Sequence, residues 1–197
     1  MKIELSGYDF RHIVLACSKA ASKNDVREAF RYIELRADGK ECVATALDGF
    51  IMQQVKCECK GKGVVLIPAD IKTEKADTVT ITAKESLRIA YYDEMNKLIL
   101  AVEMPKAECE FIDWKKAVPM GARPESVIHC EARYLRKILA ATTHAKDQVI
   151  SISIPEDKQK EIRIASNDSQ GIIMPIRVSD PLYERKAANW YKDVVDV

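Results

Sequence analysis

The chain begins with alternating apolar and polar residues and then changes to a helical period. Residues 1–6 (MKIELS) alternate in the manner of a half-buried strand. In residues 8–23 apolar side chains recur three or four positions apart, which predicts an amphipathic helix. The predicted buried face consists of Phe10, Ile13, Val14, Cys17 and Ala21. The opposite face carries Arg11, His12, Lys19 and Lys23.

Strand-like segments follow as far as residue 104. Residues 30–37, 40–47 and 50–59 are separated by Asp38-Gly39 and Asp48-Gly49, and each Asp-Gly pair predicts a hairpin turn. We expect the next four residues, KGKG, to be flexible. A further strand then runs up to Pro68, which is expected to open a short helix. Three more strand candidates complete this part at 77–83, 86–92 and 98–104.

The opening pattern returns after a linker at 111–126, a stretch with two prolines, a glycine and no periodicity. Beyond it we expect a strand, a helix and three strands, at 126–132, 133–146, 148–154, 161–166 and 171–178. A β-α-β-β-β unit therefore occurs at both ends of the chain, with a helix-poor stretch between them. The sequence predicts an α+β fold of antiparallel sheets with helices on one face.

The second predicted helix also has two faces. One face is expected to carry Tyr134, Leu135, Ile138, Leu139 and Thr142. Its other side carries Arg133, Arg136, Lys137 and Lys146. Acidic residues are almost absent from both predicted helices and stand only at their starts, so positive charge is segregated onto them.

Pro175 interrupts the last apolar segment, GIIMPIRV at 171–178. A proline inside a strand removes a ladder hydrogen bond, so this strand must lie at an edge or end there. Two interpretations stay open. The apolar residues are either the core side of a closing strand, which is the commoner case, or an exposed surface that binds a partner.

Composition narrows the possible functions. The chain has 197 residues and a net charge of +1, so overall charge gives no argument for nucleic-acid binding. No apolar run approaches the length of a membrane span, and the N-terminus lacks a signal-peptide core, so we expect a cytoplasmic protein without membrane contact. Six cysteines are present, including the pair Cys57 and Cys59, but their spacing does not predict a metal site.

Catalysis is not expected. The chain has three histidines, His12, His129 and His144, and none lies beside a paired carboxylate or a nucleophile in a catalytic arrangement. No P-loop, G-x-S-x-G or H-E-x-x-H motif occurs. We predict no cofactor and no bound metal.

Four stretches, in order along the chain, resemble the bacterial DNA polymerase III beta subunit, the sliding clamp. They are ATALDGFIM (44–52), VLIPADIK (65–72), FIDWKKAVP (111–119) and IIMPIRV (172–178). Two features depart from the family. Leu47 and Ile51 stand where the clamp turn has threonine and arginine, and residues 120–178 have room for one half-unit where a clamp's last domain has two.

The resemblance implies a DNA-clamp-like fold with sheets outside and helices lining a ring. It divides the chain into a clamp-like domain of two half-units at 1–117, the second of them helix-poor, a half-domain at 118–178, and a C-terminal tail at 179–197. The tail contains Trp190 and Tyr191, which we expect to pack on the body or on a partner.

The resemblance also implies an apolar cleft that accepts a short linear peptide from a polymerase or repair protein. Carried over to this chain, the cleft consists of Leu47, Asp48, Gly49, Ile51, Met52, Val118, Pro119, Ile172, Met174, Pro175, Ile176 and Arg177. Methionine and isoleucine side chains adapt to several ligands, and each buried anchor contributes about 1.5–3 kcal/mol.

Duplex DNA is the second partner that the resemblance implies. The residues expected to face phosphates are Arg11, Lys19, Lys23, Arg133, Arg136, Lys137 and Lys146. The commoner alternative for such residues is a solvated helix face. Two functions stay open. One is a homo-oligomeric processivity factor, at most an accessory subunit of a polymerase. The other is a module that forms no ring and recruits or sequesters clamp-binding proteins.

Overall fold

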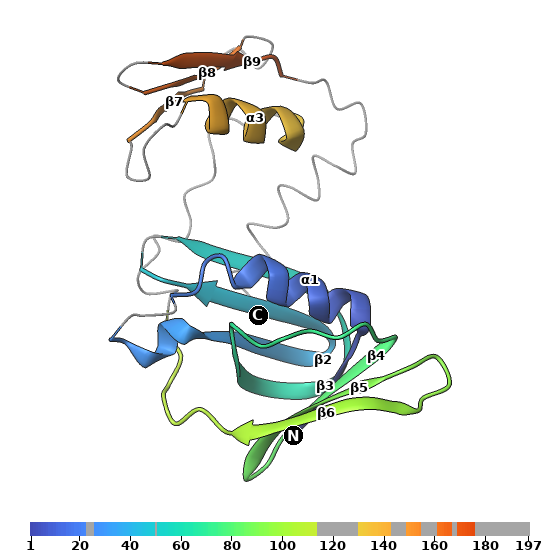
Figure 1. Cartoon of the computed structure of the whole chain (residues 1–197). Helices are drawn as coiled ribbons and strands as arrows, with labels where there is room; N and C mark the ends of the chain where they lie inside the picture. Colours follow the sequence, from blue (N-terminus) through green and yellow to red (C-terminus); the bar gives the residue numbers. More distant parts are fainter. Residues whose placement is uncertain are drawn as a thin grey trace. The chain divides into compact units, whose positions relative to one another are not determined.

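A computed structural model of the whole chain describes residues 1–22, 26–49, 51–113, 130–142, 149–154, 161–166 and 169–175. The chain divides into two compact units, Met1–Asp113 and Trp114–Val197 (Figure 1).

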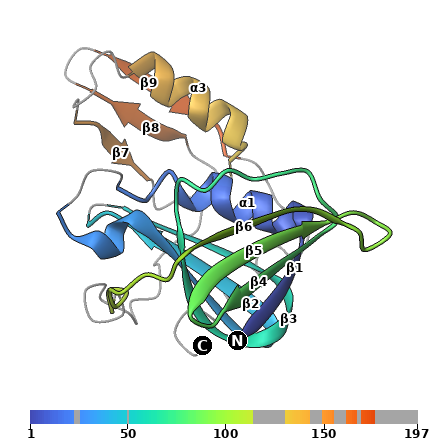
Figure 2. The same ribbon diagram turned by 60° about the horizontal axis from the view of Figure 1, so that its bottom comes forward.

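A six-stranded antiparallel sheet forms the first unit, with the strand order β2-β3-β1-β4-β5-β6. Its strands are β1 Lys2–Ser6, β2 Tyr32–Leu47, β3 Met52–Pro68, β4 Thr78–Ala83, β5 Ser86–Tyr92 and β6 Leu98–Pro105. Helix α1 (Gly7–Cys17) lies across one face of this sheet, and a short 3-10 helix, η1 (Glu28–Arg31), leads into β2 (Figure 2). The predicted first strand and the three predicted strands before residue 105 are confirmed.

The core of this unit lies between α1 and the sheet. The predicted apolar residues Phe10, Ile13, Val14 and Cys17 are all buried, because the helical period turns them to the same side. The ring of Phe10 meets that of Tyr91 edge-on, with centroids 5.9 Å apart. This contact joins the helix to a strand from the second half of the unit.

The predicted hairpin turn at Asp38-Gly39 is wrong. β2 continues through this pair with a bulge and stays paired with β3 from Tyr32↔Pro68 to Leu47↔Met52. Asp38 Oδ1 accepts hydrogen bonds from the backbone N–H groups of Lys40 and Glu41, at 2.8 and 2.9 Å. The Asp side chain and the glycine conformation that can form a hairpin turn here form a β-bulge within one strand.

Glycines on both strands make this bend possible. Gly39 pairs with Gly61, and their φ angles are +114° and +97°. A side chain on Gly61 would overlap the carbonyl group of Lys2, because β1 pairs with β3 next to this point, through Glu4 and Lys60. The KGKG segment, predicted to be flexible, is thus part of β3.

The predicted helix after Pro68 is also absent from the described residues. β3 ends at Pro68, and Ala69 N–H donates to the carbonyl of Arg31 at 2.9 Å. Ile71 N–H donates to the Pro68 carbonyl at 3.3 Å, which forms a single turn. The chain then continues to β4 without a helix. After Pro68 the backbone therefore bonds to Arg31, the last residue of η1, and does not form the first turn of a helix.

The second unit contains α3 (Ala132–Thr142) and a three-stranded antiparallel sheet of β7 (Ser151–Ser153), β8 (Ile162–Ala165) and β9 (Gln170–Ile173). In its described core, Leu135, Ile138 and Leu139 of the helix pack against Ile162, Ile164 and Ile173, together with Cys130 and Ile150. The sequence predicts a strand at 126–132. Its described residues Cys130 and Glu131 form no strand, and Ala132 begins α3, whereas 126–129 lie outside the described residues. The α+β prediction, with a helix on one face of an antiparallel sheet, is confirmed.

Candidate functional site

The outward face of α1 is the first candidate surface. Ser6 caps the helix: its Oγ accepts a hydrogen bond from Asp9 N–H at 3.0 Å and donates one to Asp9 Oδ2 at 2.6 Å. An acidic residue in the first turn also suits the positive end of the helix dipole. The one carboxylate of this helix is therefore hydrogen-bonded at its start.

Arg11 and Lys19, two of the predicted DNA-facing residues, are exposed. Neither side chain forms an ion pair with another described residue. Tyr8 and His12 share this side of the helix, with ring centroids 6.3 Å apart, and Leu15 is 58% exposed. Lys23 lies outside the described residues. The exposed face of α1 thus carries unpaired positive charge beside aromatic and apolar groups.

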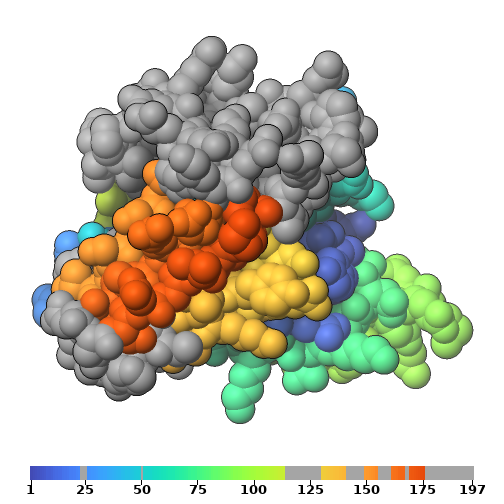
Figure 3. All heavy atoms as spheres, turned by 90° about the horizontal axis from the view of Figure 1, so that it is seen from above, coloured from blue at the N-terminus to red at the C-terminus, as the bar shows by residue number. Residues whose placement is uncertain are grey.

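The outward face of α3 is the second candidate surface, and its atoms, gold in Figure 3, lie beside those of β8 and β9. Arg136 and Lys137 are exposed there and form no ion pair within the described part of the chain. Arg133 is engaged: its Nη2 donates to Glu131 at 3.2 Å and to the hydroxyl of Tyr134 at 3.1 Å. Lys146 lies outside the described residues.

Tyr134 differs from its predicted position. The helical period placed it with the apolar residues, but its side chain is 44% exposed and the Arg133 guanidinium lies 4.7 Å from its ring centroid. A tyrosine can be exposed at low cost when a cation covers its ring. The apolar face of α3 is therefore narrower than the sequence indicated.

The turn between β2 and β3 carries the first part of the predicted peptide cleft. Asp48 N–H donates to the Ile51 carbonyl at 3.2 Å, and Ile51 N–H donates to Asp48 Oδ1 at 3.0 Å. Gly49 has a φ of +94°, which favours glycine, and a side chain added there would contact the ring of Phe30. Leu47 is buried, whereas Ile51 and Met52 are 52% and 36% exposed. The predicted turn at Asp48-Gly49 is confirmed, and it exposes two large apolar side chains.

The end of β9 carries the second part. The strand ends at Ile173, two residues before Pro175, as expected for a proline that cannot donate to the ladder. Ile173 points into the core and is 3% exposed, while Ile172 and Met174 are 59% and 61% exposed. β9 is an edge strand of its sheet. The sequence leaves two interpretations open for this segment, a buried closing strand or an exposed surface. Ile173 is buried as in the first, and its neighbours Ile172 and Met174 are exposed as in the second.

The predicted cleft residues fall into both units of the chain. Leu47, Asp48, Gly49, Ile51 and Met52 belong to the first unit, and Ile172, Met174 and Pro175 to the second. Val118, Pro119, Ile176 and Arg177 lie outside the described residues, as do Trp190 and Tyr191. The shared cleft therefore stays a prediction.

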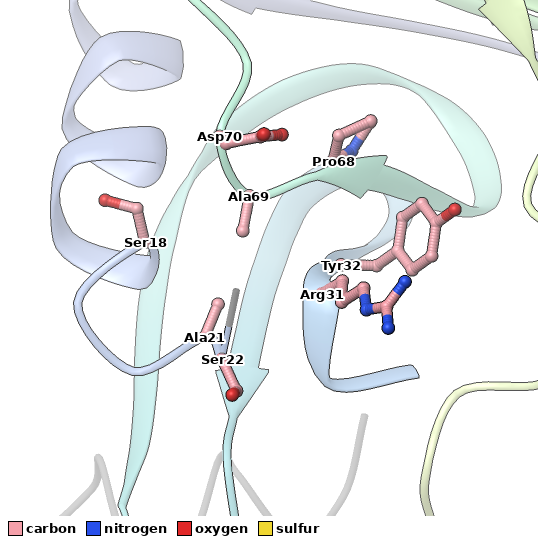
Figure 4. Close-up of a pocket in the computed structure, with 8 residues that line it drawn as sticks. All are labelled: Ser18, Ala21, Ser22, Arg31, Tyr32, Pro68, Ala69 and Asp70. Carbon is pink, nitrogen blue, oxygen red and sulfur yellow. The ribbon is translucent and has the colours of Figure 1, made fainter. Parts of the chain in front are cut away.

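A small pocket of about 180 Å³ lies within the first unit, where the end of α1 meets η1 and the end of β3 (Figure 4). Its lining residues are Ser18, Ala21, Ser22, Arg31, Tyr32, Pro68, Ala69 and Asp70. Tyr32 donates to Glu28 Oε1 at 3.2 Å, and burial together with this bond raises the pKa of Tyr32. Sequence reasoning did not single out this place, because it forms only where three distant segments meet.

Cys17 is one of the buried thiols of the first unit. Burial raises the pKa of Cys17 to about 12, so this thiol stays protonated at neutral pH. Among the described residues, no three His, Cys, Asp or Glu side chains are placed to hold a metal ion. None of the described helices is long and apolar enough to cross a membrane.

No protein-family model matches the sequence, and neither does any curated protein. Solved structures do match. The DNA polymerase sliding clamp of Bacillus subtilis is 17% identical with a TM-score of 0.66, over 90% of this chain and 50% of the clamp chain. A Pseudomonas aeruginosa clamp with a ligand is 14% identical with a TM-score of 0.70, over 91% and 52%. The DNA polymerase beta subunit of Streptococcus pyogenes is 11% identical with a TM-score of 0.59, over 91% and 52%.

These identities are too low to carry over activity or site residues, but they agree on the architecture. The match extends over nearly the whole of this chain and about half the length of each clamp chain. The resemblance found in four short motifs is thereby confirmed at the level of structure. This chain has the fold of the bacterial DNA polymerase III sliding clamps.

Proposed function

We propose that this chain is a sliding-clamp-like processivity factor. In this role it holds duplex DNA through non-specific backbone contacts and docks polymerase or repair proteins through an apolar peptide-binding cleft. The observation that carries the proposal is the clamp fold over about nine-tenths of the chain, with exposed basic residues on both of its described helices. It is a binding function and needs no catalytic group.

The DNA contacts are proposed for Arg11 and Lys19 of α1 and for Arg136 and Lys137 of α3. All four side chains are exposed, and none is paired with a described carboxylate. Arg and Lys contacts to phosphates are independent of sequence and weaken as salt rises, which suits a protein that slides. Arg133 is expected to contribute less, because it first has to leave Glu131.

The DNA contact is tested by titrating a fluorescent duplex with protein over a series of salt concentrations. The double variant Arg11→Ala/Lys19→Ala removes two charges from α1, and Arg88→Ala/Lys97→Ala removes two exposed charges elsewhere in the first unit. The slope of log K against log salt should become shallower by about 2 in the first variant. The control should keep the wild-type slope. Equal slopes in both variants would contradict the assignment.

The peptide contact is proposed for the exposed side chains Ile51 and Met52 of the first unit and Ile172 and Met174 of the second. An extended peptide with aliphatic and aromatic anchors would bury these groups, which water now surrounds. Methionine at two of the four positions suits a surface that accepts several clients.

A fluorescent peptide with two leucines followed by a phenylalanine is a suitable probe. Met174→Ala should weaken its binding about tenfold, or about 1.4 kcal/mol. Met95→Ala is the matched control, because Met95 is 79% exposed in the turn between β5 and β6. Equal affinity for wild type, Met174→Ala and Met95→Ala would remove the cleft from the proposal.

The second candidate is a clamp-derived interaction module that forms no ring. It is favoured by the length of the match, since the chain spans about half of each clamp chain. Several copies would have to assemble before DNA could be surrounded. Sedimentation velocity over a wide concentration range separates the two functions. A constant monomer that binds the peptide but shows no salt-dependent DNA binding would favour the module.

A further inference from the structure

Two cysteines stand opposite each other in the long β2–β3 hairpin. Cys42 and Cys57 are direct Cα partners in the antiparallel ladder. Opposed residues of such a pair have Cα atoms about 4.5–5.5 Å apart and side chains on the same face of the sheet. A disulfide spans Cα distances of about 4.4–6.8 Å. The backbone therefore already holds these two residues at a bridging distance.

Their surroundings give the two thiols different roles. Cys42 is fully buried, whereas Cys57 is half-buried and packs only partly into the same core. Interaction with the neighbouring Cys42 side chain lowers the pKa of Cys57, and interaction with Cys57, together with burial, raises the pKa of Cys42. Burial and the nearby Asp9 carboxylate raise the pKa of Cys57 and so oppose part of this lowering. Cys57 is thus the thiol that reagents reach and that ionises first.

We propose that Cys57 and Cys42 form a thiol-exchange site that reacts with small disulfides of the glutathione disulfide class. The Cys57 thiolate, which has released its proton to water, attacks one sulfur of the small disulfide. A mixed disulfide forms, and the first small thiolate leaves and takes up a proton. Cys42 then loses its proton and attacks Cys57 Sγ, which releases the second small thiol. Two protein thiols are oxidised to one cross-strand disulfide, and one small disulfide is reduced to two thiols.

The other described cysteines do not offer this arrangement. Cys17 is fully buried, and its thiol points at the carbonyls of Ala44 and Gln53, at 3.9 Å each. Cys59 lies on the same strand as Cys57, and its thiol points at the Gly61 carbonyl, also at 3.9 Å. Burial raises the pKa of both. Strand pairing places none of the other described cysteines opposite one another.

The test uses the full-length chain, reduced and then incubated with glutathione disulfide. Remaining thiols are alkylated, and disulfide-linked peptides are identified by mass spectrometry without reduction. We expect wild type to lose two thiols and to yield a linked peptide pair that contains Cys42 and Cys57. In Cys42→Ser the reaction should stop at a glutathione adduct on Cys57. In Cys57→Ser, Cys42 should stay reduced.

Several results would overturn the proposal. These are an adduct on Cys57 in wild type that never resolves, a Cys57–Cys59 link, or equal modification of Cys109 and Cys130. The variant Cys109→Ser serves as a control, because this half-buried cysteine lies outside the hairpin and should leave the linked pair unchanged. If Cys42→Ser does not fold, Cys42→Ala and the wild-type peptide map still decide the outcome. The proposal is independent of DNA or peptide binding.

Discussion

Gly61 is a position where a single added methyl group should disturb the fold in two ways. It combines a φ of +97° with close packing: a Cβ would overlap the carbonyl oxygen of Lys2 and lie 3.3 Å from Ile3 Cα. Gly39, its partner across the ladder, has a φ of +114° but nothing within 4 Å of an added Cβ. The substitutions Gly61→Ala and Gly39→Ala therefore share backbone strain and differ in the clash.

The two costs can be separated. Placing alanine in this backbone region costs about 1–3 kcal/mol at either position. At Gly61 the main chain of Lys2 must also move away, which disturbs the pairing of Glu4 with Lys60. Overpacking of this kind costs about 1–3 kcal/mol more. The ion pair between Lys60 and Glu4, at 3.1 Å, lies at the surface, so its loss would add little to the cost of Gly61→Ala. We expect Gly61→Ala to lower the free energy of unfolding by about 2–6 kcal/mol.

The measurement has to report on the first unit alone. Both tryptophans, Trp114 and Trp190, belong to the second unit, so their fluorescence would follow the wrong part of the chain. Hydrogen exchange of peptides from Met1–Asp113, measured in increasing urea, gives the stability of the first unit. Equal losses for Gly61→Ala and Gly39→Ala, or a larger loss for Gly39→Ala, would refute the view that β1 presses on β3 at this glycine.

Two further predictions concern α1 and the core. Ser6→Ala removes the N-cap bond to Asp9 and should cost about 1 kcal/mol, whereas Ser6→Thr should retain most of the stability, as measured by the same exchange experiment. Burial raises the pKa of Tyr91 to about 12, so the folded chain keeps this proton to higher pH than the unfolded chain. The contribution of Tyr91 to the free energy of unfolding should therefore be constant below about pH 10 and be lost between about pH 10 and 12. Tyr91→Phe should make that fall shallower, and an unchanged pH profile would contradict the assignment.

The elements governed by local pattern were predictable. The core face of α1 follows from the spacing of Phe10, Ile13, Val14 and Cys17, and the turn at Asp48-Gly49 from its two flanking strands. At Asp38-Gly39 the same dipeptide predicts a turn but forms a bulge, because its conformation depends on Gly61 and Lys2, which are far away in sequence. A bulge and a turn use the same residues, and only the partner strand distinguishes them.

The candidate site was predictable only in part, for a similar reason. The period of a helix predicts which basic residues face outward, and Arg11, Lys19, Arg136 and Lys137 do so. It does not predict that Arg133 pairs with Glu131 and stacks on Tyr134, because these are neighbours with alternative rotamers. The proposed cleft combines the Asp48 turn with the end of β9, which belong to different units, and no local period encodes how such segments combine.

The place of β1 in the sheet has a consequence for how the chain is made. β1 precedes β2 and β3 in the chain, yet it lies between β3 and β4, and its longest pairing is with Thr78–Thr82. The β2–β3 hairpin needs only its own residues and can close as soon as Pro68 has emerged. Until β4 follows, β1 has no partner on that side. A nascent chain arrested before residue 78 would therefore hold a closed β2–β3 hairpin while the edge of β1 that later pairs with β4 stays unpaired.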